Sequence, residues 1–195
     1  YARLLPQIEA IERPPGYMLD WGGEFEDSFE AQDALFKSLP SGFLMMIIVT
    51  VLLFSAVRQP LFIWLVVPFA IIGITAGLLL FRGSFDFMAL LGALALIGLM
   101  IKNSIVLVEE IDLQIAQGKA PLTGVLDAAV SRMRPVMMAA TTTILGLIPL
   151  LSDVFFVNMS ITMMAGLGVA TVLTLVIIPT WYATLFRIPN DEQAE

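Results

Sequence analysis

The 195-residue sequence contains neither cysteine nor histidine. Without cysteine the chain can form no disulfide and offers no thiolate for catalysis or metal binding. Without histidine it lacks the usual metal ligand and the side chain that normally titrates near neutral pH. Charge is also scarce, at 14% of residues against about 25% in an average soluble domain. The sequence predicts no metal site, and it lacks the basic surface and the glycine-rich loop that nucleic-acid or phosphate binding would need.

Apolar residues are what the sequence has in excess. They make up 58% of the chain, and the mean hydropathy is +0.91, whereas soluble domains are about 45–50% apolar. The composition therefore predicts an integral membrane protein. The net charge of −7 is unevenly spread, because eight of the seventeen acidic residues lie between residues 9 and 33, before the first apolar run. A short acidic soluble segment thus precedes the membrane domain.

Five apolar runs are long enough to cross a bilayer as helices, since a hydrocarbon core of about 30 Å needs roughly 20 residues. They predict spans over residues 39–57, 61–81, 87–108, 136–156 and 160–186. Arg82 is the one basic residue between spans on one side, while five lie on the other: Arg58, Lys119, Arg132, Arg134 and Arg187. Basic residues in short loops mark the cytoplasmic side, so residues 1–38 are predicted outside the cytoplasm and the tail 187–195 inside it.

Small residues and prolines recur within the spans. Gly73 with Gly77, and Gly166 with Ala170, form small-xxx-small pairs that let helix backbones approach closely, although such residues are also simply common in spans. Three prolines each remove a backbone donor and should kink or break a helix: Pro68, Pro149 and Pro179.

The stretch 109–135 predicts a separate helix between two spans. Pro121 suits its first position and Pro135 marks a turn into the next span. Apolar residues recur at three- and four-residue intervals: Leu122, Val125, Leu126, Ala129, Val130 and Met133. We expect this helix to lie on the cytoplasmic membrane surface, with a short helix packed only on protein as the alternative.

Residues 1–38 show a helix end, a strand at "YMLDW" (17–21) and a second helix that leads into the first span. One strand and parts of two helices cannot bury a core, so we interpret them as the end of a larger α/β domain. The chain begins at Tyr1 without an initiator methionine or a signal peptide, which also suggests a segment of a longer protein. The acidic residues 24–30 scatter around a helix, and this pattern favours a solvated face over cation binding.

Lys102 and Asn103 lie inside the third predicted span, about 10 Å from its cytoplasmic end. A charged residue there costs about 2.5–3.5 kcal/mol and is functional by default. Ala95 and Gly98 lie on the same helix side, which therefore suits close contact with another helix, although a snorkelling lysine is the alternative. The only acidic residue within the predicted spans is Asp153, near the end of the fourth, so Lys102 is either neutral or paired with a carboxylate on a span outside this sequence.

Three consecutive threonines, Thr141, Thr142 and Thr143, should lie level with Lys102 on the next span. Their hydroxyls could face the lysine or could bond carbonyls of their own helix.

Two motifs carry a family resemblance. "GLMIKNSIVLVEE" (98–110) and "AAVSRMRPVMMAATTTILGLIPL" (128–150), followed by a glycine-rich last span, resemble the C-terminal quarter of resistance–nodulation–division (RND) efflux transporters, closest to acriflavine-resistance-type hydrophobe/amphiphile exporters. "PPGYMLDWGGEFEDSFEAQ" (14–32) is similar to the end of their periplasmic porter domain. The resemblance implies an all-α polytopic membrane bundle, its five helices matching the last five of twelve, preceded by the α/β tail of a porter subdomain.

The resemblance also implies a function. Such proteins are proton-driven antiporters of the bacterial inner membrane, not enzymes; they use no cofactor and work as homotrimers with a periplasmic adaptor and an outer-membrane channel. Their intramembrane lysine pairs with two aspartates of the fourth span, which here would lie in the missing N-terminal remainder. Lys102 matches that lysine, Asn103 its neighbour and Arg132 an arginine at the start of the next span, and the resemblance implies that these three residues belong to the proton relay. Many relatives carry a threonine where this sequence has Ala139, so we assign the hydroxyl of the relay to Thr142, one turn away.

Other readings stay open. An RND relative could export heavy-metal ions or lipids or assist protein export, but the 11 methionines are scattered at packing positions and the Lys-Asn pair at 102–103 favours a drug exporter. A membrane scaffold without transport is an alternative of another class, although a scaffold has no reason to bury Lys102.

Overall fold

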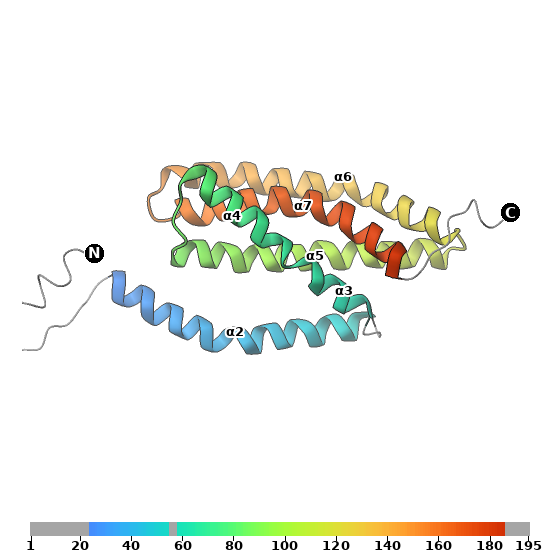
Figure 1. The fold of residues 1–195 in the computed structure, drawn as a ribbon, viewed down its shortest axis with the longest axis horizontal. Helices are drawn as coiled ribbons and strands as arrows, with labels where there is room; N and C mark the ends of the chain where they lie inside the picture. The colour runs from blue at the N-terminus through green and yellow to red at the C-terminus, as the bar shows by residue number, and fades with distance from the viewer. Residues whose placement is uncertain (1–23, 55–57, 186–195) are drawn as a thin grey trace, which may run out of the picture. The chain divides into compact units, whose positions relative to one another are not determined.

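The computed structural model describes residues 24–54 and 58–185, and these are helical wherever they are regular (Figure 1). The elements are α2 (Glu24–Phe54), α3 (Arg58–Val66), α4 (Phe69–Phe81), α5 (Phe87–Ala116), α6 (Pro121–Leu147), the 3-10 helix η1 (Ile148–Ser152) and α7 (Val157–Leu185). No strand occurs within these ranges. The strand predicted at 17–21, and with it most of the α/β tail, lies outside the described residues.

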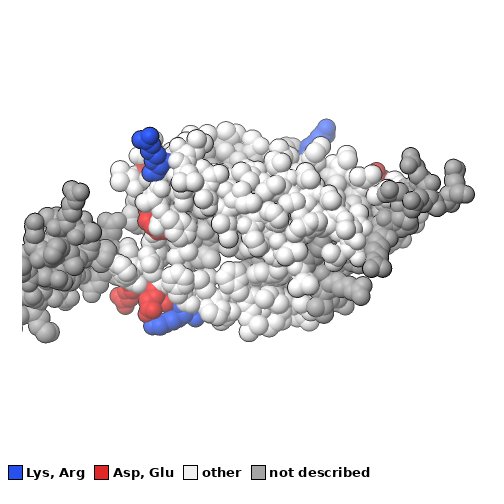
Figure 2. All heavy atoms as spheres, viewed as in Figure 1, with Lys and Arg blue, Asp and Glu red and all other residues white. Residues whose placement is uncertain are grey.

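Five helical segments are long and apolar enough to cross a membrane, which confirms the predicted multi-pass membrane bundle. They are Ser28–Phe54, Gln59–Phe81, Phe87–Ala116, Pro121–Ser152 and Val157–Leu185. On the face drawn in Figure 2 the charged side chains lie toward the ends, and the middle is uncharged. This distribution is the one expected where hydrocarbon surrounds the middle of the bundle.

The chain divides into two compact units, residues 1–44 and 45–195. The described part of the first unit is the N-terminal part of α2. There Lys37 and Asp33 form an exposed ion pair of 2.5 Å, and the helix continues through Pro40. Phe29 and Phe36 are both exposed.

The second unit is a bundle in which α7 contacts α3, α4, α5 and α6 (Figure 1). Small residues bring α4 and α7 together. A Cβ added to Gly73 would lie 2.9 Å from the Gly166 Cα, and one added to Gly77 would lie 2.2 Å from the Ala165 Cβ. Ala170 is completely buried. Only residues without a larger side chain allow backbones to approach this closely.

A polar contact joins the α4–α5 loop to the start of α7. Asp86 caps α5 by accepting from the Ala89 N–H at 2.8 Å. The Asn158 side chain donates to Asp86 at 2.5 Å and to the Ser84 hydroxyl at 3.0 Å. These bonds cap the start of α5 and connect the α4–α5 loop to α7.

The prolines behave differently from one another. Pro68 lies in the turn between α3 and α4, and Pro149 lies in η1, where α6 ends. Both confirm the predicted break. α7 continues through Pro179, so there the helix tolerates the loss of one backbone donor.

The structure corrects the prediction for residues 109–135. α5 continues to Ala116, and α6 runs unbroken from Pro121 through Pro135 to Leu147, so no separate surface helix exists. Gly118, with φ at 86°, makes the intervening turn.

The buried side of α6 shares one residue, Val125, with the predicted apolar stripe. It consists of Gly124, Val125, Ala128 and Ala140, whereas Leu126, Val130 and Met133 are exposed. In a membrane bundle the small residues form the helix contact, and large apolar side chains need not be buried against protein. The stripe therefore predicted a helix correctly, and three of its large side chains lie exposed on the surface of the bundle.

Candidate functional site

Lys102 lies in the middle of α5 on an open face. Its side chain is exposed, and it makes no hydrogen bond or ion pair with any residue of 24–54 or 58–185. Ala95 is also exposed, and a Cβ added to Gly98 would have no atom within 4 Å. The opposite side of the same helix is buried, at Leu96 and Met100 among others. The narrow face that the sequence predicted around Lys102 is thus left uncovered by the described helices.

The carboxylates of α5 are too far along the helix to reach this lysine. Glu109 and Glu110 come seven and eight residues later, or about 10–12 Å along the axis. An ammonium in the apolar middle of a bundle needs a counter-ion, and none of the described residues supplies it. The site can therefore receive an anionic group from outside this set of helices.

The other predicted relay residues do not meet Lys102. Asn103 is half-buried beside it, and its side chain makes no hydrogen bond to a described residue. The Thr142 hydroxyl donates to the Met138 carbonyl at 2.8 Å, and the Thr143 hydroxyl donates to the Ala139 carbonyl at 2.9 Å. These are bonds within α6, as the alternative interpretation of the threonines expected.

A shallow hollow lies over the same part of α6. It has a volume of about 260 Å³ and is lined by Met137, Met138, Thr141 and Thr142. Thr141 and Thr142 are both exposed. The threonine segment, like Lys102, therefore lies on a part of the bundle surface that the described helices leave open.

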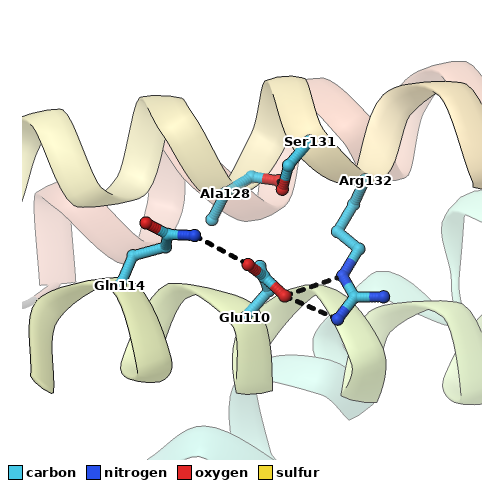
Figure 3. Close-up of polar contacts among 5 residues, drawn as sticks. All are labelled: Glu110, Gln114, Ala128, Ser131 and Arg132. Carbon is cyan, nitrogen blue, oxygen red and sulfur yellow. Dashed lines mark hydrogen bonds and ion pairs between the residues drawn. The ribbon is translucent and has the colours of Figure 1, made fainter. Parts of the chain in front are cut away.

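Arg132 lies instead in an ion pair with Glu110 (Figure 3). Its Nε and Nη2 atoms lie 3.0 and 2.5 Å from Glu110 Oε2, and the Gln114 amide donates to Oε1 at 2.8 Å. The side chain of Glu110 is only 11% exposed, and that of Arg132 is 36% exposed. Arg132 faces α5 because it follows Val125 and Ala128 at helical spacing on the buried side of α6.

A second carboxylate joins three helices near the same end of α5. Asp112 accepts from the Gln59 amide of α3 at 2.8 Å and from the Tyr182 hydroxyl of α7 at 2.7 Å. Glu110 and Asp112 together therefore connect α5 to α3, α6 and α7. The sequence did not suggest these contacts, because the partners of the two acids are 22, 53 and 70 residues away. The available signal was the position of Glu110 on the stripe of Leu107 and Ile111, which are buried.

We expect Tyr182→Phe to destabilise the bundle by about 1.5 kcal/mol, near the lower end of the range for a hydrogen bond to a charged group. The change leaves the ring in place but removes one donor from the Asp112 carboxylate. Thermal unfolding in detergent measures it. Thr184→Val on the same helix is the control, since that hydroxyl is exposed and, among the described residues, bonds only the Thr180 carbonyl. Equal melting temperatures for the two variants would contradict the role of Asp112 in joining the helices.

Comparisons with known proteins agree with the helical arrangement. The family model described as the AcrB/AcrD/AcrF family matches residues 5–186. The chain is similar to the swarming motility protein SwrC of Bacillus subtilis (strain 168), at 30% identity over 95% of this chain and 18% of that protein. It is also similar to the multidrug export protein AcrF of Escherichia coli (strain K12), at 28% identity over 95% of this chain and 19% of that protein.

A solved structure is similar as well. The crystal structure of a heavy metal efflux pump matches with a TM-score of 0.71 and 32% identity, over 95% of this chain and 19% of that one. The chain thus spans about a fifth of the length of the relatives it matches.

Proposed function

Because the chain belongs to the AcrB/AcrD/AcrF family of RND transporters, we propose that it forms part of a proton-driven exporter of the bacterial inner membrane. The exporter uses the proton gradient and no cofactor. Lys102 is the observation that carries this proposal. Its charged side chain lies on an open face of α5 at the middle of the bundle, and it has no partner among the described residues.

The proposed mechanism is a charge switch. Carboxylates on a helix of the remaining protein lie against the narrow face formed by Ala95, Gly98 and Lys102, and they pair with the ammonium. When a proton enters from the side of higher proton concentration and neutralises a carboxylate, the ion pair breaks and Lys102 is left with an unbalanced charge. Its position then changes, because an unpaired charge in an apolar environment is costly. Release of the proton to the other side restores the pair.

Asn103 and Thr142 are proposed to assist this switch as hydrogen-bonding neighbours. Asn103 adjoins Lys102 directly, and Thr142 lies on the adjacent helix with its hydroxyl bonded to its own backbone in the present arrangement. A hydroxyl that back-bonds to its helix can exchange that bond for another one when a partner arrives.

The orientation follows from the charge of the connecting segments. We propose that the α5–α6 turn with Lys119 lies in the cytoplasm together with Arg132 and Arg134, because basic residues in short loops remain there. The N-terminal segment is then periplasmic and the C-terminus cytoplasmic. The complete exporter is proposed to be a homotrimer that works with a periplasmic adaptor and an outer-membrane channel.

For cargo we propose hydrophobic or amphiphilic compounds. The Lys-Asn pair at 102–103 supports this choice, as does the scattering of the methionines over several helices at packing positions. Metal ions are the second candidate, since a similar solved structure is a heavy metal efflux pump. A scaffold without transport remains the candidate of another class, and it gives no reason for the open lysine.

Transport by the full-length protein in vesicles with an imposed proton gradient tests the proposal. We expect movement of an amphiphilic fluorescent dye that stops when a protonophore dissipates the gradient. Cobalt and cadmium ions, assayed in parallel vesicles, are expected not to move. Gradient-dependent metal movement without dye movement would assign metal cargo instead. Movement of neither cargo, with the protein folded in the vesicles, would contradict an exporter of these classes.

A further inference from the structure

The Glu110–Arg132 ion pair joins two helices and lies apart from Lys102. Among the described residues it is the one ion pair that joins two helices, since Lys37–Asp33 lies within α2 and Lys119–Asp127 connects the turn before α6 to α6 itself. The pair lies eight residues from Lys102 along α5, or about 12 Å. Arg132 is therefore two turns away from the group with which the family resemblance associates it.

The contacts of Arg132 are all directed across to α5. Nε and Nη2 both lie on a single oxygen, Glu110 Oε2, and the other oxygen of that carboxylate accepts from Gln114 (Figure 3). The neighbouring Ser131 hydroxyl bonds the Ala128 carbonyl of its own helix and leaves the pair alone. A guanidinium held through two nitrogens has a fixed orientation as well as a fixed place.

This contact fixes the register of α6 on α5. The two helices are antiparallel neighbours joined by a short turn. Lys102 lies eight residues before Glu110 on α5, and Ala140 lies eight residues after Arg132 on α6, so the two are at about the same level of the bundle. Ala140 is buried, and the exposed Thr141 and Thr142 follow it immediately. A slip of one helical turn would displace this segment by about 5.4 Å relative to Lys102.

We propose that Glu110 and Arg132 are positioning residues, whose ion pair keeps the threonine segment of α6 level with Lys102, and that Arg132 itself transfers no proton. The assignment rests on the proposed function, because it concerns the same lysine site. It differs from the role that the resemblance implies for Arg132, and it gives Glu110 a role that the sequence did not suggest.

Exchange of the two charges in the full-length protein tests the assignment. Arg132→Glu and Glu110→Arg each place two like charges together, and we expect each to lower the proton-coupled transport rate by about 10- to 100-fold, because a displacement of about 1 Å between reacting groups can cost 10²-fold. The double variant restores the pair and should recover most of the rate. Its pH profile of transport should match that of the starting protein.

Two results would overturn the positioning role. One is a double variant that folds, with the melting temperature of the starting protein, but transports no better than the single variants. The other is a recovered rate with a shifted pH profile, since a group that carries protons would change that profile when its chemistry changes. Lys102→Ala is measured in parallel: normal transport by that variant would contradict the lysine switch itself, independently of the charge exchange.

If the double variant does not fold, a cross-link between α5 and α6 tests the positioning role instead. An added Cβ on Gly124 would lie 3.6 Å from the Gln114 Cβ, within the range of about 3.5–4.5 Å for a disulfide. The chain has no cysteine of its own. In an Arg132→Ala background, Gln114→Cys with Gly124→Cys should transport faster when oxidised than when reduced. An equal rate in the two states would mean that Arg132 does more than hold α6 against α5.

Discussion

Lys102→Ala should abolish proton-coupled transport by the full-length protein without unfolding the bundle. The side chain contributes no hydrogen bond or ion pair to the described residues, so its removal costs them no polar contact. What it removes is the counter-charge of the proposed switch. We expect a loss of about 10²-fold or more, the scale found when one preorganised electrostatic group is deleted from a reacting site.

Transport and melting temperature, measured at matched expression, separate this effect from misfolding. Lys119→Ala is the matched control, because that lysine is exposed at the end of the bundle and pairs with Asp127 on the surface. Exposed pairs of this kind contribute about 0–1 kcal/mol, so the control should transport normally. Efflux by Lys102→Ala equal to that of the control would end the switch hypothesis.

The sequence was sufficient to predict the helices and the position of the lysine. Runs of about 20 apolar residues predict spans through their length alone, and Pro68 and Pro149 interrupt helices through a local property of the backbone. Lys102 is recognisable because a charged residue is unusual within an apolar run. Each of these signals lies within a few residues of the feature it predicts.

The contacts between helices could not be predicted in the same way. Whether Glu110 meets Arg132 or a solvent molecule depends on the rotation and register of two helices, which local spacing leaves undetermined. The corrected segment 109–135 shows the same limit. Large apolar residues such as Leu126 and Val130 suggested a separate helix on the membrane surface, but α6 continues through Pro135, and the residues that it buries in this segment include the small Gly124 and Ala128.

Gly166→Ile should cause a large loss of stability. Gly166 lies where α4 and α5 meet α7: an added Cβ would lie 2.2 Å from Leu96 Cδ2 and 3.3 Å from Ile74 Cγ1. Leu96 is completely buried. Overpacking usually costs about 1–3 kcal/mol. We expect a loss of stability at the upper end of that range or more, because an isoleucine at position 166 would push both α4 and α5 away from α7.

Gly146→Ile provides the control for this prediction, since it makes the same exchange in α6 at a position where an added Cβ has no atom within 4 Å. Thermal unfolding in detergent and the yield of folded protein in membranes are the measurements. If both variants lose stability equally, the cost reflects the β-branched side chain in a helix and not the helix contact. If only Gly166→Ile loses stability, close approach at this glycine stabilises the contact of α4 and α5 with α7, and the bundle that presents Lys102 depends on it.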